Sequence, residues 1–210
     1  MPNPLNGDSE ISRWMQSLPK EQRLHSAHVK LYTAALAETL RSAKTGCPAD
    51  ELSRLGSAAY FHDIGKAWVP RALLLKAEKL TPAQLQEVRR HPLYAEKMFA
   101  LMRQDILCGM PEPLFQTARA CAVFHHEWWN GQGYPYGLSG KQIPFAARVT
   151  SLCDVYDAIT SSRVYRKAHS HAFACREIET NAGVQFDPAL ARIFLDHAEV
   201  FRAQREALGG

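Results

Sequence analysis

Six consecutive residues, Phe61-His62-Asp63-Ile64-Gly65-Lys66, place an imidazole, a carboxylate and an ammonium group side by side. They follow an apolar run of the kind that helices bury, and glycine is the residue type that ends a helix in a left-handed turn. Because neighbouring residues on a helix point about 100° apart, a His-Asp pair at a helix end can hold two metal ions that share one carboxylate. Taken alone, the pair is more typical of a capping aspartate beside a buried, hydrogen-bonded histidine.

Helical spacing of apolar residues continues on both sides of this stretch. We expect helices over about 9–18, 19–43, 49–63, 81–91, 92–102, 114–127, 144–160, 169–181 and 188–207. Asp8 or Ser9, Thr81 and Asp187 are suitable N-caps. No strand alternation, internal repeat or linker interrupts the pattern. The sequence therefore predicts a single all-α domain over 19–210, preceded by a helical extension over 1–18.

Composition limits the classes of protein that fit. With 46% hydrophobic and 22% charged residues, the chain is not of the disordered class. No apolar run reaches the ~20 residues that span a bilayer, and the start of the chain is polar and acidic, so we expect a cytoplasmic protein without membrane contact. The five scattered cysteines suggest reduced thiols. The net charge of +4 is spread along the chain, which suits an anionic substrate but not a nucleic-acid duplex.

Imidazoles and carboxylates recur along the predicted helices. The candidates for a shared metal site are Glu21, His25, His62, Asp63, His91, His125, His126 and Asp154. Each has a structural alternative: Glu21 and His25 fit a solvated pair on one helix face, and Asp154 fits a polar residue paired in the core. His91 can simply end a helix, and the histidine doublet can be surface polarity. A shared site replaces eight separate explanations with one.

This ligand set, without thiolate, suits Fe or Mn, with Zn or Ni as alternatives. Eight ligands exceed what one ion needs, so we expect two metals about 3.5–4 Å apart, bridged by Asp63. A water between them would become a hydroxide nucleophile near neutral pH. The two cations would also hold a phosphate in line with that hydroxide, and Lys66 would add positive charge on the phosphate side.

The same residues belong to a longer ordered series of motifs. It comprises His62-Asp63-Ile64-Gly65-Lys66, His91-Pro92, His125-His126-Glu127, Asn130-Gly131-Gln132-Gly133-Tyr134-Pro135, Ile143-Pro144, Ala147-Arg148-Val149, Asp154-Val155-Tyr156-Asp157-Ala158, Arg163-Val164-Tyr165-Arg166 and Phe186-Asp187-Pro188. In this order the chain resembles the HD-GYP family of bacterial cyclic-dinucleotide phosphodiesterases, a branch of the HD metal-dependent phosphohydrolases. The resemblance implies an HD-type helical bundle with a metal centre in its core.

The resemblance also assigns roles to individual residues. It makes the histidines and aspartates of the candidate set the metal ligands, and Glu21 the extra carboxylate of members that hold three metals rather than two. Asp63 and Lys66 become the catalytic pair, with Lys66 near the scissile phosphate. The implied substrate contacts are Lys66, Tyr134, Pro135, Arg163 and Arg166. Departures from the usual family residues are His28, Ala95, Asn130 and Val164.

Family members open cyclic di-GMP to linear pGpG, and some continue to GMP, as part of bacterial second-messenger signalling. The resemblance therefore implies a cyclic di-GMP phosphodiesterase. Two alternatives stay open: the same chemistry on 3′,3′-cyclic GMP-AMP or a linear oligonucleotide, and a catalytically idle module that binds cyclic di-GMP. Members of the family often pair with diguanylate cyclases, so such an enzyme or another regulatory protein is the expected partner.

Overall fold

The computed structural model of the chain describes residues 9–43, 47–104, 109–162 and 167–209. Two of the predicted substrate contacts, Arg163 and Arg166, lie outside these ranges. The described helices are α1 (Glu10–Ser17), α2 (Lys20–Ser42), α3 (Ala49–Ala59), η1 (Ile64–Trp68), α4 (Arg71–Leu74), α5 (Pro82–Val88), α6 (His91–Gln104), α7 (Glu112–Phe124), η2 (Gly140–Gln142), α8 (Phe145–Thr160), α9 (His171–Thr180), α10 (Pro188–Asp196) and α11 (Ala198–Ala207).

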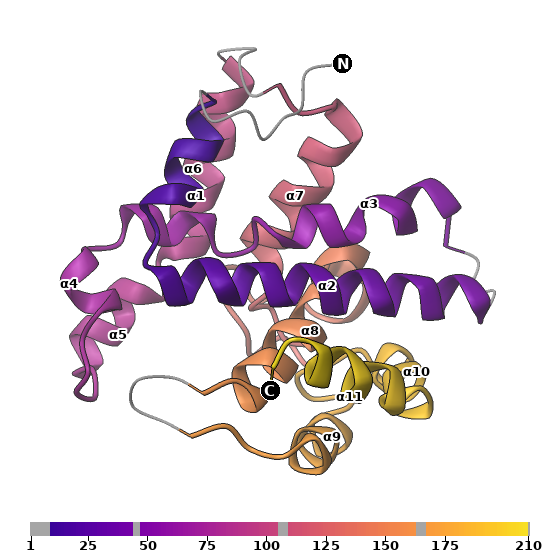
Figure 1. Cartoon of the computed structure of the whole chain (residues 1–210). Helices are drawn as coiled ribbons and strands as arrows, with labels where there is room; N and C mark the ends of the chain where they lie inside the picture. Colours follow the sequence, from indigo (N-terminus) through magenta and orange to yellow (C-terminus); the bar gives the residue numbers. More distant parts are fainter. Residues whose placement is uncertain (1–8, 44–46, 105–108, 163–166, 210) are drawn as a thin grey trace.

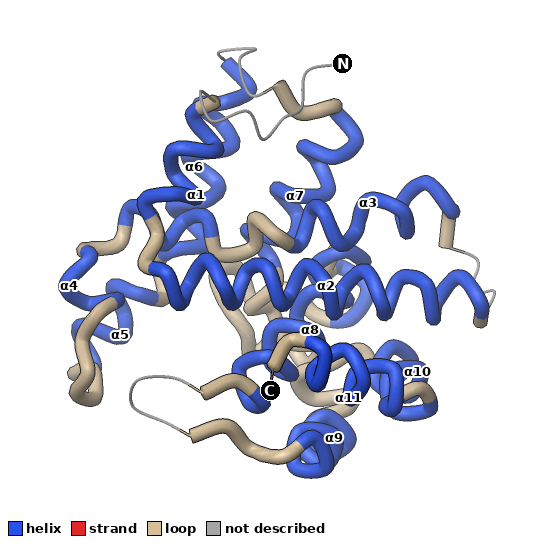
Figure 2. The backbone as a smooth tube through the Cα atoms, viewed as in Figure 1, coloured by secondary structure: helices blue, strands red, loops and turns tan. Residues whose placement is uncertain are grey.

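The predicted all-α class is confirmed (Figure 2). Over the described ranges, the only extended pairing consists of two isolated bridges, Asn130–Ser139 and Ala182–Phe186. None of the helices in these ranges combines the length and apolar character needed to cross a bilayer.

The long helix α2 crosses the middle of the molecule, with α3 beside it and α8 against it (Figure 1). Its inward face carries Val29, Tyr32, Leu36 and Leu40, all essentially inaccessible to solvent. Helix α3 lies close because Gly56 has no side chain: a Cβ there would lie 2.8 Å from Ala34 Cβ. Burial of this apolar stripe holds the helices together.

Helix α1 packs on η1, and its residues Ile11 and Met15 are buried in the shared hydrophobic core. Trp14 meets Trp68 of η1 edge to face, with ring centroids 6.0 Å apart. Ser9 accepts a hydrogen bond from the Ser12 backbone N–H, as expected of an N-cap. The description of 1–18 as a separate extension stays a prediction.

The corner after α3 differs from the prediction. We expected the helix to continue to Asp63, but it ends at Ala59. The chain then tightens, since Phe61, His62 and Ile64 donate backbone hydrogen bonds to residues three positions earlier, a 3₁₀ pattern. His62 and Asp63 therefore lie in a turn, which lets consecutive side chains point to different neighbours.

Gly65 has a different role from the predicted one. It does not adopt the left-handed conformation, and it lies inside η1 rather than at a helix stop. A Cβ at Gly65 would lie 1.9 Å from the His91 carbonyl oxygen and 2.7 Å from the Ala95 backbone nitrogen. Glycine is required here because η1 and the first turn of α6 are in backbone contact.

Two helix boundaries near the predicted ligands also differ. Thr81 caps α5 as predicted and forms a capping box with Gln84, but this helix ends at Val88 and His91 begins α6 instead of ending α5. Helix α7 ends at Phe124, so His125 is its C-cap and His126 lies beyond it. Packing and capping decide where α5 and α7 end, and helix propensity does not specify either of them.

The C-terminal part forms two helices where one was predicted. Asp187 caps α10 by accepting from the Ala189 N–H at 2.9 Å, as expected. The helix then breaks at His197, whose backbone is not helical. Phe194 and Phe201 stack with ring centroids 3.9 Å apart, and α11 turns back onto α2. Stacking of these two buried rings outweighs continuation of a single helix.

Candidate metal centre

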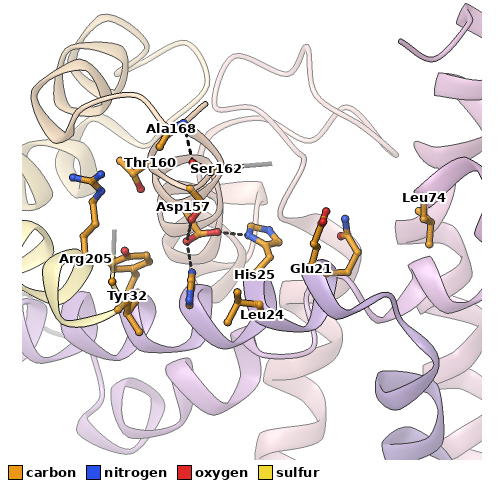
Figure 3. Close-up of a pocket in the computed structure, with 15 residues that line it drawn as sticks. Glu21, Leu24, His25, Tyr32, Leu74, Asp157, Thr160, Ser162, Ala168 and Arg205 are labelled. Carbon is orange, nitrogen blue, oxygen red and sulfur yellow. Dashed lines mark hydrogen bonds and ion pairs between the residues drawn. The ribbon is translucent and has the colours of Figure 1, made fainter. Parts of the chain in front are cut away.

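Asp157 on α8 orients two histidines of α2 (Figure 3). Its Oδ2 is 2.6 Å from His25 Nδ1, and its Oδ1 is 3.0 Å from His28 Nδ1. Ser161 also donates to Oδ1, at 2.9 Å. Asp157 is 1% exposed, and these donors, against the effect of burial, hold the pKa of its carboxyl well below the usual range. It is therefore a buried, charged anchor for His25.

A first group of candidate ligands, which we call the α2–α8 cluster, consists of His25, His62 and Asp154. One side-chain nitrogen or oxygen from each lies within 4.8 Å of the others. His25 Nε2 is 2.9 Å from Asp154 Oδ1 and 3.3 Å from His62 Nε2. The second nitrogen of His62, Nδ1, is 2.9 Å from the Ala59 carbonyl oxygen and donates to it. His62 therefore presents its Nε2 lone pair to the cluster.

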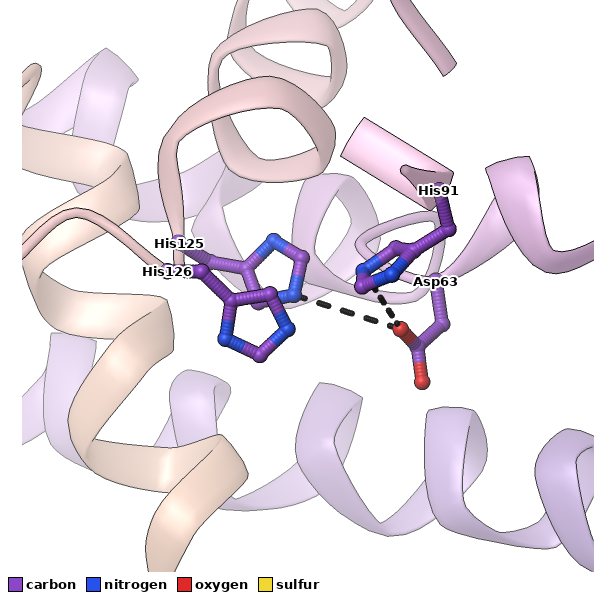
Figure 4. A group of neighbouring side chains, drawn as sticks. All are labelled: Asp63, His91, His125 and His126. Atoms are coloured by element: carbon purple, nitrogen blue, oxygen red, sulfur yellow. Dashed lines mark ion pairs between the residues drawn. The ribbon is translucent and has the colours of Figure 1, made fainter. Parts of the chain in front are cut away.

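A second group, the α6–α7 cluster, consists of Asp63, His91, His125 and His126 and also lies within 4.8 Å (Figure 4). His91 Nδ1 donates to the Val88 carbonyl oxygen at 2.9 Å. His125 Nδ1 donates to the Cys121 carbonyl oxygen at 2.8 Å. Both rings are therefore fixed with Nε2 turned toward the centre, the arrangement found around metal ions in proteins.

Asp63 lies between the two clusters. Its Oδ1 is 3.3 Å from His91 Nε2 and 3.9 Å from His125 Nε2. Its Oδ2 is 3.4 Å from His62 Nε2 and 3.8 Å from His25 Nε2. Each oxygen thus faces one cluster, the position expected of a carboxylate that bridges two ions. Burial disfavours the charge, but Lys66 and His62 hold the pKa of the Asp63 carboxyl well below its usual range.

The residues present fit divalent metal ions. Within the described part of the chain, His91 Nε2 and His125 Nε2 are buried and have no hydrogen-bond partner. Burial lowers the pKa of His91 to about 4 and that of His125 to about 3, so both rings are neutral at pH 7. A buried lone pair that no donor satisfies is destabilising unless a cation takes it. Nitrogen and oxygen donors of this kind suit several divalent transition metals.

Lys66 lies at the edge of the centre. Its Nζ is 2.6 Å from Asp63 Oδ2 and 3.0 Å from Gln22 Oε1. A cation in this position neutralises part of the charge of Asp63 and can turn toward an anion that approaches the centre. Its predicted contact with the scissile phosphate stays a prediction.

Glu21 is placed apart from both clusters. It is exposed on α2, one turn before His25, and lines a pocket that His25 also borders (Figure 3). Its predicted role as ligand to a third metal stays a prediction.

The loop after α7 covers the α6–α7 cluster. Tyr134 stacks on His126 with ring centroids 4.7 Å apart, and the Arg89 guanidinium lies 5.5 Å from the Tyr134 ring centroid. Gly133 allows this approach, because a Cβ there would lie 2.2 Å from the Trp128 backbone nitrogen. Tyr134 therefore supports His126, one of the candidate ligands, while the predicted substrate contacts of Tyr134 and Pro135 stay predictions.

Glu127 organises the same loop from beneath. It is 2% exposed, and its carboxylate accepts from the backbone N–H of Tyr136 at 2.7 Å and of Leu138 at 2.9 Å. The sequence pattern alone indicates no role for Glu127, Asp157 or Arg89. For Asp157 the signal was present, since it follows Asp154 by three residues and thus lies on the same face of α8. The residues next to Glu127 and Arg89 in the sequence give no indication of the contacts that these two side chains make.

A family model described as an HD domain matches residues 12–190. The chain belongs to the HD-domain family. This confirms the family to which the motifs point. A structure of an HDG"Y"P protein from Bdellovibrio bacteriovorus has a TM-score of 0.58 at 18% identity, covering 89% of this HD-domain chain and 52% of that one. This likeness supports the fold alone.

Two curated relatives come from Vibrio cholerae. A probable cyclic di-GMP phosphodiesterase is 38% identical over 182 residues, covering 84% of this chain and 40% of the relative. A 3′3′-cGAMP-specific phosphodiesterase 2 is 30% identical over 198 residues, covering 94% of this chain and 35% of the relative. The HD-domain chain thus spans two fifths or less of the length of these relatives.

Proposed function

We propose that this HD-domain protein is a metal-dependent phosphodiesterase that opens cyclic di-GMP to linear pGpG. The single observation that carries the proposal is the position of Asp63, with one carboxylate oxygen facing each of two histidine clusters. The similarity to a probable cyclic di-GMP phosphodiesterase supports the choice of substrate class. Iron or manganese is the metal we propose, because the donors are imidazoles and carboxylates without thiolate.

The proposed chemistry divides between the ions and the chain. Paired divalent cations, when bound, lower the pKa of water and offset negative charge on a phosphate. The chain holds its ligands ready: His91 and His125 are neutral and fixed through Nδ1, so no proton has to leave them first. Asp63 supplies negative charge to both clusters. Lys66 Nζ, 2.6 Å from Asp63 Oδ2, can turn and donate a hydrogen bond to a substrate phosphate oxygen.

The test is turnover of cyclic di-GMP by protein purified without oxygen, with Fe(II) or Mn(II) supplied and the metal content measured. We expect pGpG to form in proportion to the bound metal. The control is Asp196→Ala, which removes an exposed carboxylate paired with Arg192 far from the clusters and is expected to keep full activity. Absence of product in protein with verified metal content would refute the proposal.

One specific observation supports a second substrate. The 3′3′-cGAMP-specific relative matches 94% of this chain, so the fold and metal ligands alone do not select between the two cyclic dinucleotides. A competition assay with both substrates and a linear dinucleotide decides, and we expect cyclic di-GMP to have the largest kcat/KM. Binding of cyclic di-GMP without turnover of any of them would instead identify an idle binding module.

A further inference from the structure

A pocket of about 340 Å³ lies beside the α2–α8 cluster (Figure 3). His25, His28 and Asp157 border it near the metal centre. Helix α11 borders it through Arg205. Ligand pockets in proteins range from about 300 to 1,000 Å³, so this one suits a part of a dinucleotide rather than the whole.

Arg205 is the unusual member of the lining. Its Nε is buried and has no hydrogen-bond partner, and its guanidinium makes no ion pair with any residue that the structure describes. Arginine stays charged in proteins and has five donors but no acceptor. Because buried donors are normally satisfied, the unpartnered Nε of Arg205 in the pocket wall indicates a ligand that brings an acceptor.

Arg205 lies beyond the residues that the HD-domain model matches. The HD-domain match ends at residue 190, and α11 begins at Ala198.

The remaining lining has the character of a nucleobase site. The hydroxyls of Thr160, Ser161 and Ser162 provide polar edges, and Leu24 and Leu74 provide apolar surface. The carboxylates of Glu21 and Asp157 also border the pocket. Asp157 is already paired with His25 and His28, but the exposed carboxylate of Glu21 would repel a phosphate and not a neutral base, which favours a base as the acceptor for Arg205.

We propose that this pocket binds one guanine of the cyclic dinucleotide and that Arg205 donates to its O6 and N7 acceptors. This inference rests on the proposed function, since it assigns a binding site to one base of the same substrate. Guanine presents two adjacent acceptors to an arginine fork, whereas adenine replaces O6 with an amino donor. Arg205 would thus be a specificity-determining residue that favours guanine over adenine.

The experiment compares wild type, Arg205→Lys and Arg205→Ala on cyclic di-GMP and cyclic di-AMP. Lysine keeps the charge but lacks the planar fork. We expect the ratio of kcat/KM between the two substrates to fall about 10-fold or more in both variants. The matched control is Arg202→Ala, one turn earlier on α11, whose side chain is exposed and paired with Glu199. Its ratio is expected to equal that of wild type.

Calorimetric dissociation constants of GMP and AMP give a second readout that needs no turnover. We expect wild type to bind GMP more tightly and Arg205→Lys to lose this preference. An unchanged ratio, or an equal decline for both bases, would overturn the assignment, because a phosphate contact or a purely structural role weakens both alike. If wild type fails to hydrolyse cyclic di-GMP, the proposed function fails, while the GMP and AMP constants still decide the role of Arg205.

Discussion

The two candidate ligand clusters, each of which one oxygen of Asp63 faces, differ in how they hold protons. In the α6–α7 cluster, burial depresses the pKa of His91 to about 4 and that of His125 to about 3, and their Nε2 atoms have no partner in the described structure. In the α2–α8 cluster, hydrogen bonds to Asp154 and Asp157 outweigh burial and raise the pKa of His25 to about 9.

Both clusters use imidazole and carboxylate, so the difference in histidine pKa comes from the groups that are hydrogen-bonded to each ring. The carbonyl oxygens of Val88 and Cys121 fix the rings of His91 and His125 without strongly favouring their protonated forms. Two carboxylates flank His25 and favour its protonated form. The α6–α7 cluster is thus ready for an ion, whereas an ion that binds His25 has to displace a proton.

The largest expected effect comes from Asp63, whose two carboxylate oxygens face one cluster each. Asp63→Ala removes a ligand oxygen from each, so we expect both ions to be lost and turnover to fall to the level without added metal. Metal analysis of the purified variant, together with the cyclic di-GMP assay, measures this. A variant with full rate and both metals would show that Asp63 does not bridge.

Gly65→Ala is expected to act on one cluster more than the other. The new Cβ would meet the His91 carbonyl oxygen at 1.9 Å, so α6 has to move and carry His91 with it. Overpacking of this kind destabilises by about 1–3 kcal/mol. We expect the ion of the α6–α7 cluster to bind more weakly, measured by metal titration.

The control for Gly65→Ala is Gly56→Ala, whose new Cβ would make a milder clash, 2.8 Å from Ala34 Cβ, between α2 and α3. It is expected to lower the free energy of unfolding while metal content stays at the wild-type value. Equal metal loss in the two variants would mean that general destabilisation, and not the position of His91, explains the result.

Asp157→Asn tests the other cluster. The amide keeps the shape of the side chain but removes the charge that orients His25 through a 2.6 Å hydrogen bond. Loss of such a partner of a metal ligand weakens metal affinity or activity by about 10–100-fold. The matched change His28→Gln leaves the His25–Asp157 contact intact and is expected to have a smaller effect. If the two variants behave alike, Asp157 acts on the fold and not through His25.

Much of this arrangement was predictable from the sequence. Apolar periodicity and capping residues predicted the all-α class, and the series of motifs predicted which family and which imidazoles and carboxylates belong together. The clusters bring together His25, His62, His91, His125, His126, Asp63 and Asp154, seven of the eight predicted ligands. These signals are readable because periodicity and motif order are properties of the chain itself.

Other features depend on long-range packing and were not predictable. The break at His197 follows from stacking of Phe194 on Phe201, which sequence spacing does not reveal. Gly65 was interpreted as a helix stop, yet its reason is backbone contact with a residue 26 positions later. The charge state of His25 likewise depends on Asp157, more than 130 positions away. Contacts of this kind appear only once the chain is folded.

The last prediction is a pH dependence of stability in the metal-free protein, in which the two clusters act in opposite directions. His91 and His125 have pKa values below the ordinary 6.5 in the folded state. They take up protons on unfolding below pH 6.5, so the free energy of unfolding falls from pH 6.5 toward pH 4. His25 has a raised folded pKa of about 9. Its contribution is complete below pH 6.5 and is lost as the pH rises through 9.

Denaturant unfolding with a chelator from pH 4 to pH 9 is therefore expected to show a maximum of stability near pH 6.5. Each fully titrating group changes the free energy by about 1.4 kcal/mol per pH unit. His25→Gln is expected to remove the decline on the alkaline side, and His125→Gln to reduce the decline on the acid side. The two variants are expected to change opposite sides of the curve of unfolding free energy against pH. A decline on the alkaline side that persists in His25→Gln would show that the protonated His25 does not stabilise the metal-free fold.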